Sequence, residues 1–234
     1  LRARFMALNE GRMARAVEGL TPRQQSVLTL LPLFFHVNHP LLPGYVSGST
    51  PAGLSNFEPD AQALAEAQRL TRSFSYKPRP VNQPKPIHGL FLMGSLGTLA
   101  QADQSDMDVW VCHAPDLGEN ELAELRKKCQ LLEAWALTMG AEAHFFLIEP
   151  TRFVLGERDT QLSSDDCGTT QHYLLLDEFY RTAIWLAGRT PIWWLVPVYE
   201  ETRYAEFTHT LLSKRFIRAD ETLDLGHLAH IPPG

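Results

Sequence analysis

The middle of the chain, residues 87–148, changes its hydrophobic period in an order that few folds accommodate. Residues 87–93 are a short apolar run that stops at Gly94-Ser95, and residues 106–112 alternate acidic and apolar side chains. Both patterns are typical of β-strands. Residues 119–139 carry apolar side chains three and four apart, which predicts a helix, and residues 141–148 form a third predicted strand. The order predicts an α/β (α+β) fold in which helices flank a small mixed β-sheet.

The first 80 residues have a different character. Helical spacing and an N-cap signal at Thr21-Pro22 predict three helices, over residues 1–20, from residue 22 to a stop before Pro40, and over residues 60–73. Prolines, glycines and serines make residues 39–59 irregular, and four prolines mark a connector over residues 77–86. We therefore expect a helical extension over residues 1–80 that packs on a core formed by residues 81–234.

The last third of the chain is less regular. A loop rich in Ser, Asp and Gly over residues 156–169 precedes a predicted helix over residues 171–187 that ends at Gly188, and an apolar run follows at residues 192–198. The chain begins at Leu1 without an initiator methionine and stops at Pro-Pro-Gly. We therefore expect a piece of a longer protein, with a core that is truncated at its C-terminus.

Charge and composition exclude several classes of protein. The 234 residues carry 27 acidic and 21 basic side chains, a formal net charge of −6, which disfavours a nucleic-acid partner. The longest apolar stretch, residues 28–37, is about half of a membrane span, so no spanning segment is expected. Three cysteines cannot all pair within one chain, and none lies in a CxxC motif. A reducing compartment fits this pattern best.

The most informative motif combines Gly94-Ser95 with Asp106 and Asp108, after a spacer of ten residues. Residues two apart in a strand lie on the same face, roughly 6.6 to 6.8 Å apart at Cα, so both carboxylates project to one side. Neighbouring carboxylates repel unless a cation such as Mg²⁺ lies between them. Glycine lets the backbone approach a phosphate, and serine adds a hydroxyl. This combination predicts a nucleotide–metal site; the alternative is an edge strand with two solvated acids.

The motif resembles the signature of the DNA polymerase β-like nucleotidyltransferase superfamily, which implies a sheet of nucleotidyltransferase type. Longer blocks resemble the class I adenylate cyclases of gammaproteobacteria, and they lie at residues 36–45, 106–113, 128–129, 166–172 and 174–183. The similarity extends from about residue 25 to Gly226. Several blocks are long enough to make chance an unsatisfactory explanation.

The resemblance implies an enzyme that converts ATP to 3′,5′-cyclic AMP and pyrophosphate with two Mg²⁺ ions, for which Mn²⁺ can substitute. Asp106 and Asp108 would hold both ions, and Gly94 and Ser95 would bind the β- and γ-phosphates. The superfamily supplies a third carboxylate from a neighbouring strand, for which Glu142 is the candidate, although an aspartate is usual there. Glu142 would complete the metal coordination or accept the proton of the attacking hydroxyl.

Five further residues can be interpreted either as part of the functional site or as structural residues. Lys128 and Arg181 lie in blocks that resemble the family and would bind the triphosphate; alternatively, Lys128 extends along its own helix and Arg181 pairs with Asp177. Trp110 shares the strand face of the aspartates and is either a contact for base or ribose or, as we favour, part of the core. His36 and His39 could ligate a metal, but structural hydrogen bonding is favoured because no third ligand is near in sequence.

The resemblance also implies a cytoplasmic enzyme with a C-terminal regulatory region. In enteric members a protein of the sugar phosphotransferase system acts through that region. Two other functions fit the motif: a nucleotidyltransferase that passes AMP to a separate acceptor, and a non-catalytic module that senses ATP. The intact Asp106 and Asp108 argue against the sensor, because binding alone does not require both carboxylates.

Overall fold

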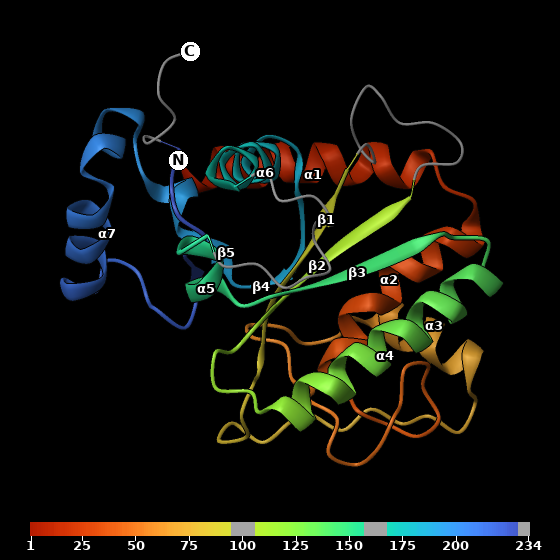
Figure 1. Cartoon of the computed structure of the whole chain (residues 1–234). Helices are drawn as coiled ribbons and strands as arrows, with labels where there is room; N and C mark the ends of the chain where they lie inside the picture. The colour runs from red at the N-terminus through yellow and green to blue at the C-terminus, as the bar shows by residue number, and fades with distance from the viewer. Residues whose placement is uncertain (95–105, 157–167, 229–234) are drawn as a thin grey trace.

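The structure is a computed structural model that describes residues 1–94, 106–156 and 168–228, except for the side chains of residues 168–171. Within these residues the chain forms a four-stranded sheet in the order β3-β2-β1-β4 and a two-stranded sheet of β5 and β6. In the larger sheet β1 is antiparallel to both β2 and β4, whereas β2 is parallel to β3 (Figure 1). The predicted mixed α/β class is therefore confirmed.

The elements have the following bounds. The strands are β1 (Ile87–Met93), β2 (Met107–His113), β3 (Ala143–Ile148), β4 (Ile184–Gly188), β5 (Thr190–Pro191) and β6 (Thr222–Leu223). The α-helices are α1 (Arg2–Glu18), α2 (Pro22–His36), α3 (Ala61–Leu70), α4 (Glu119–Thr138), α5 (Pro150–Val154), α6 (Gly168–Thr182) and α7 (Tyr204–Ser213). Two short 3₁₀ helices follow β5, η1 (Ile192–Leu195) and η2 (Val198–Arg203). No helix among the described residues is long and apolar enough to cross a bilayer.

Local chemistry explains the start of α2. Thr21 accepts a hydrogen bond from the Gln24 backbone N–H, and the Gln24 side chain accepts one from the Thr21 N–H. This capping box satisfies two donors that a helix N-terminus otherwise leaves unpaired, and Pro22 has no N–H to satisfy. The predicted helix start at Thr21-Pro22 is confirmed.

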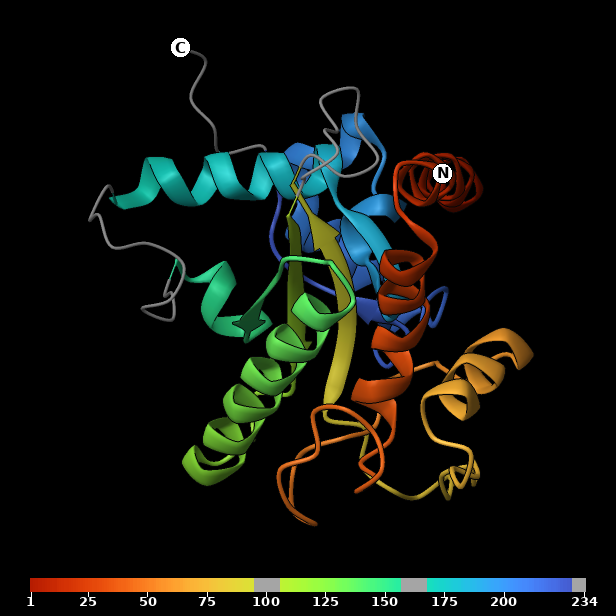
Figure 2. The ribbon, with the colours of Figure 1, turned by 90° about the vertical axis from the view of Figure 1, so that its right-hand side faces the viewer.

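Helices cover both faces of the sheet. Side chains alternate along each strand, so β1, β2 and β3 each contribute to two buried clusters. On one face α2 and α4 pack over Leu90, Leu92, Val109, Val111, Phe145 and Leu147. On the other face α5 and α6 pack over Phe91, Trp110 and Cys112. Figures 1 and 2 show α6 and α4 on opposite sides of the sheet, whereas α1 lies along β4 and its Ala16 joins the cluster of α2 and α4.

The N-terminal helices share a core with the sheet. Phe34 and Phe35 of α2 are fully buried in the same cluster as the β1 and β2 side chains. Phe35 lies against Phe145 of β3, with ring centroids 5.8 Å apart. Residues on both sides of position 80 thus contribute to one core, and a domain boundary at that position stays a prediction.

One predicted element is wrong. We expect a helix over residues 171–187, but α6 ends at Thr182 and the next residues form β4, which pairs with β1. Gly188 does not cap a helix: its φ is +98°, and a Cβ there would lie 2.5 Å from the His88 carbonyl oxygen. Glycine is needed where the backbones of β1 and β4 come this close. Pairing with a strand about 90 residues away overrides the local helical spacing.

A side chain closes the outer edge of β4. The amide of Asn9 on α1 donates to the Trp185 carbonyl oxygen (3.0 Å), and its own oxygen accepts from the Trp185 N–H (2.7 Å). Asn9 is 7% exposed. An asparagine side chain thus mimics the backbone of a neighbouring strand and satisfies the strand edge, which would otherwise be open to pairing with another chain.

Replacing this amide should destabilise the fold. In Asn9→Ala the N–H and C=O of Trp185 lose their partner, which costs about 1–3 kcal/mol of unfolding free energy. Urea denaturation followed by circular dichroism measures the change. Asn120→Ala is the matched control, because Asn120 is exposed and should change stability by less than about 0.5 kcal/mol. Equal effects of the two substitutions would contradict the proposed edge pairing.

Candidate functional site

Parallel pairing of β2 with β3 gathers four polar side chains at one end of the sheet. Asp108 is paired in register with His144, and the Met107 N–H donates to the Glu142 carbonyl oxygen (2.8 Å). Asp106 therefore lies beside Glu142, and Asp108 beside His144. Strands are about 4.8 Å apart and alternate residues share a face, so the four side chains form a two-by-two array. This array of Asp106, Asp108, Glu142 and His144 is called the acidic array below.

Three members of the acidic array approach one another closely. A ligand atom from each of Asp106, Glu142 and His144 lies within 4.8 Å of the other two. The Nε2 atom of His144 is 3.6 Å from Oε1 of Glu142, and the two side chains are 46% and 64% exposed. Solvent-accessible oxygen and nitrogen atoms at this spacing are able to share one divalent cation.

Asp108 occupies a different environment from its neighbours. Its side chain is half-buried, and this burial raises the pKa of the Asp108 carboxyl; the nearby charge of Asp106 raises it further, whereas His144 lowers it. Within the described residues no lysine or arginine forms an ion pair with Asp106, Asp108 or Glu142. A bound cation would stabilise the ionised form of these carboxyl groups.

Gly94 lies directly beside the acidic array. It follows Met93, the residue of β1 that pairs with Asp108, and it has a φ of +90°. A Cβ at Gly94 would lie 3.7 Å from Oδ2 of Asp108. The predicted phosphate-binding turn therefore begins next to the carboxylates. Ser95, the other half of that motif, lies outside the described residues.

Trp110 belongs to the core, the interpretation favoured from the sequence. It is 2% exposed, and its ring stacks on Phe179 with centroids 5.1 Å apart. Phe153 contacts the same ring edge-on at 5.4 Å. Trp110 thus packs α5 and α6 against β2, two residues beyond Asp108.

The structure does not bring Lys128 to the acidic array. Lys128 lies on α4, which covers the opposite face of the sheet, and it is 1% exposed. Its Nζ atom lies 5.9 Å from the centre of the Phe35 ring, and its stem packs against Gly44. Burial lowers the pKa of the Lys128 amine to about 8. Lys128 is a core residue with its charge over an aromatic ring.

Arg181 lies closer to the array in the fold, but it is paired elsewhere. It is near the end of α6, just before β4, and Ile184 of β4 pairs with Leu92 of β1. This places Arg181 at the same end of the sheet as Gly94. Its Nε atom donates to Asp177 at 2.7 Å, and its side chain is 73% exposed. The alternative ion pair on its own helix is therefore present.

The two N-terminal histidines make structural hydrogen bonds, as favoured from the sequence. His36 is fully buried; its Nδ1 accepts from the Leu54 N–H (3.2 Å), and its Nε2 lies 3.3 Å from the Tyr76 hydroxyl. His39 accepts from the Leu41 N–H (3.2 Å). Burial lowers the pKa of His36 to about 4, which keeps its imidazole neutral near pH 7.

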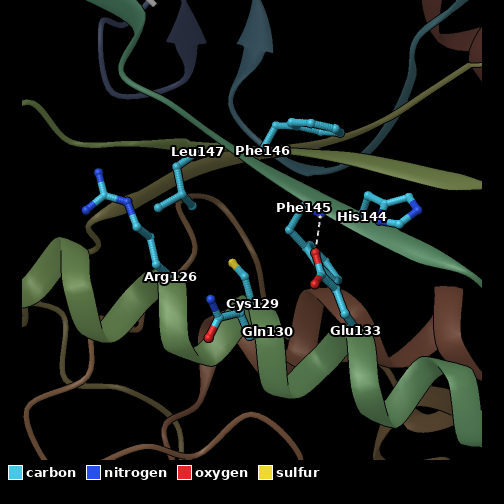
Figure 3. Close-up of a pocket in the computed structure, with 8 residues that line it drawn as sticks. All are labelled: Arg126, Cys129, Gln130, Glu133, His144, Phe145, Phe146 and Leu147. Atoms are coloured by element: carbon cyan, nitrogen blue, oxygen red, sulfur yellow. Dashed lines mark hydrogen bonds between the residues drawn. The ribbon is translucent and has the colours of Figure 1, made fainter. Parts of the chain in front are cut away.

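A cavity of about 230 Å³ lies next to the array, between α4 and β3. Figure 3 shows Phe145 and Leu147 directed toward α4 and Phe146 on the other side of the strand. The Glu133 side chain accepts a hydrogen bond from the Phe145 N–H (3.1 Å), so it satisfies part of the outer edge of β3. His144, a member of the acidic array, also lines this cavity.

Sequence reasoning missed one member of the array, His144. The signal was present, because His144 alternates with Glu142 and Phe146 on the same face of the predicted third strand. Asp106, Asp108 and Glu142 were selected for their carboxylates. The imidazole joins the array only because β3 pairs with β2 and brings His144 near Asp106, which no local spacing indicates.

Comparisons with known proteins give a consistent result. The family model described as "Adenylate cyclase NT domain" matches residues 1–194. The chain is 42% identical over 237 residues to an adenylate cyclase of Escherichia coli K12, 42% identical over 232 residues to one of Salmonella typhimurium, and 40% identical over 233 residues to one of Proteus mirabilis. Each alignment covers 99% of this chain but 27% of the relative. The chain thus spans about a quarter of the length of these curated relatives, and no solved structure matches it.

The buried position of Lys128 leads to a test. Lys128→Met keeps the packing volume and removes an amine that is costly to charge, so it should raise the unfolding free energy by about 1–3 kcal/mol near pH 7. Because the pKa of Lys128 is lowered to about 8, the native protein binds fewer protons than the unfolded chain between about pH 8 and pH 10.5. Wild-type stability therefore rises through this window and the advantage of the variant shrinks.

The matched control is Lys127→Met, which changes an exposed neighbour and should be nearly neutral. Urea denaturation near pH 7 and pH 10 gives the stability of each variant. A pH-independent loss of stability in Lys128→Met would contradict the account of the buried amine. A large loss of ATP affinity in that variant would instead support the predicted phosphate contact.

Proposed function

The chain belongs to the adenylate cyclase N-terminal domain family, and from this premise we propose that it catalyses the conversion of ATP to 3′,5′-cyclic AMP and pyrophosphate. The observation that carries the proposal is the acidic array beside Gly94. The family match covers residues 1–194, which include the four residues of the array. The chain spans about a quarter of the length of its relatives. The activity named for those relatives is therefore a proposal for this chain.

The residues of the array fit divalent metal ions. Asp106, Asp108 and Glu142 offer carboxylate oxygens at one end of the sheet, without an arginine or lysine partner among the described residues. We assign two Mg²⁺ ions to these three carboxylates, with Mn²⁺ as a substitute. When bound, the ions lower the pKa of the ribose 3′-hydroxyl and neutralise the charge of the triphosphate.

Side chains and backbone of the protein would bind the phosphates and position the 3′-oxygen. The positive φ of Gly94 and its lack of a Cβ leave room for phosphate oxygens next to Asp108. Ser95 would donate its hydroxyl to the β- or γ-phosphate, which fixes the leaving pyrophosphate. Positioning of the 3′-oxygen opposite that leaving group permits in-line attack on the α-phosphorus. One P–O bond forms, the bond to the pyrophosphate oxygen breaks, and the 3′-hydroxyl proton leaves.

Glu142 is the proposed third carboxylate. Its exposure and its closeness to Asp106 support a role in completing the metal coordination or in accepting the 3′-hydroxyl proton. Arg181 lies at the correct end of the sheet to contribute charge to the triphosphate, provided that it leaves Asp177. The position of Lys128 supports packing and not phosphate binding.

Other parts of the interpretation rest on the resemblance alone. A sheet of nucleotidyltransferase type, a cytoplasmic location and control by a protein of the sugar phosphotransferase system belong to the proposal for the longer protein. The described residues supply no contact that bears on the regulatory partner.

Loss of either aspartate should abolish the activity. Asp106→Asn and Asp108→Asn each remove a metal ligand, and loss of about 4 kcal/mol of transition-state stabilisation would slow cyclic AMP formation by about 10³-fold. Asp106 is exposed and Asp108 half-buried at one end of the sheet, and asparagine has nearly the shape of aspartate, so the circular dichroism spectrum should not change. Chromatographic separation of the nucleotides after incubation with ATP and Mg²⁺ measures the rate.

Asp116→Asn is the matched control, because Asp116 is exposed beyond the opposite end of β2. It should keep wild-type activity. The assay uses both this chain and a second protein in which this chain replaces the matching 27% of the Escherichia coli K12 relative. Wild-type rates in the Asp106 or Asp108 variants would refute the metal assignment. AMP attached to an acceptor, with no cyclic product from either protein, would favour the nucleotidyltransferase alternative.

A further inference from the structure

We propose that His144 is a ligand of one metal ion in the acidic array, and that its nitrogen makes this position favour a transition metal such as Mn²⁺ over Mg²⁺. The inference rests on the proposed function for the presence of a metal, but it concerns a residue that neither the family motif nor the sequence analysis selected. It deepens the site by naming the class of ion that one position takes.

Geometry supplies the first argument. Asp106, Glu142 and His144 each bring a ligand atom within 4.8 Å of the other two. His144 lies in β3, and Asp106 and Glu142 directly precede β2 and β3, whose register is set by continuous pairing from Met107–Ala143 to Cys112–Ile148 and by the Met107 N–H bond to the Glu142 carbonyl oxygen. Because the main chain fixes the positions, the site is formed without a ligand and needs only side-chain rotation to bind one.

The state of the imidazole supplies the second argument. His144 makes no hydrogen bond within the described residues, and its Nε2 atom is 3.6 Å from Glu142, which is longer than a hydrogen bond. An ordinary His–Glu pair would be closer. The ring is 46% exposed, so its nitrogen is accessible to an ion from solvent.

Ligand chemistry supplies the third argument. Mg²⁺ is a hard ion that takes oxygen atoms and keeps several waters, whereas first-row transition metals also accept imidazole nitrogen. Mn²⁺ is the weakest binder of that series and shares carboxylate ligands with Mg²⁺, so the nitrogen is the ligand that separates the two ions here. Two carboxylates and one imidazole on one side of an ion leave other coordination positions open for substrate oxygen or water. A set of three carboxylates would lack this preference.

Asp108 lies outside this group of three. It is half-buried beside Gly94, and its carboxylate oxygens are not among the ligand atoms of Asp106, Glu142 and His144 that lie within 4.8 Å of one another. The array therefore offers unlike positions: an oxygen-only position at Asp108 and Asp106, and a mixed oxygen–nitrogen position at Asp106, Glu142 and His144. Selectivity for Mn²⁺ should belong only to the second.

Electron spin echo envelope modulation of Mn²⁺ bound to the nucleotide-free protein tests the proposal directly, because it detects a ¹⁴N nucleus coordinated to the ion. We expect ¹⁴N modulation in the wild-type protein. It should be replaced by a ¹⁵N pattern when the histidines are ¹⁵N-labelled, which requires no substitution. In His144→Asn the modulation should disappear, and the Mn²⁺ affinity should fall by about tenfold or more, while the Mg²⁺ affinity changes by less than about threefold.

His209→Asn is the matched control, since His209 is an exposed histidine on α7. It should keep both the modulation and the affinity. Absence of nitrogen modulation in the wild type, or its persistence in His144→Asn, would overturn the proposal. Cyclic AMP formation is measured separately with Mg²⁺ and ATP. A protein that shows the nitrogen signal but forms no cyclic AMP would retain the ligand assignment and lose the proposed function.

Discussion

The parallel pairing of β2 with β3 is the constraint on which the rest of the structure depends. It sets Asp108 opposite His144 and Asp106 beside Glu142. A slip of one residue would turn these side chains toward the cluster under α2 and α4 and bring Val109 to the face that carries the acidic array. The register is held from the other side of the sheet, where Met107, Val109 and Phe145 are buried under α2 and α4. Apolar packing on one face thus positions the chemistry on the other.

The acidic array has an unfavourable charge distribution that the fold tolerates. Asp108 is half-buried near Asp106, and burial raises its pKa, so the ionised form is destabilised without a counter-ion. Sites that conflict with local stability rules are commonly functional. The stability comes from two buried clusters, which contain most of β1 and β2 and in which Trp110 stacks on Phe179.

Much of this arrangement can be predicted from the sequence because it follows short-range patterns. The alternation at residues 106–112 places Asp106 and Asp108 on one face, and the spacing in residues 119–139 predicts α4. The strand β4 was not predicted because its stability comes from pairing with β1, about 90 residues earlier. The spacing of apolar residues in residues 171–187 matches a helix, and a glycine such as Gly188 is also the residue that commonly follows the end of a helix.

Lys128 illustrates a second limit of local patterns. A lysine within a helix is expected to reach solvent, but Lys128 is covered by the irregular segment that precedes α3. In that segment Gly44 packs against Lys128 and Leu132, and Ser47 and Thr50 donate hydrogen bonds to Glu124. No local pattern shows that this segment covers α4. The approach of His144 and Glu142 to Asp106 is likewise a property of two strands together, whereas the spacing of Asp106 and Asp108 is a property of one.

The most direct test of the central claim is anomalous diffraction from crystals of this protein grown with Mn²⁺ and an ATP analogue that cannot cyclise. The account predicts anomalous peaks at the acidic array, within bonding distance of Asp106 and at least one of Asp108, Glu142 and His144, with the phosphates of the analogue beside Gly94. Peaks at another place in the fold, or an analogue bound on the α4 face of the sheet, would contradict it.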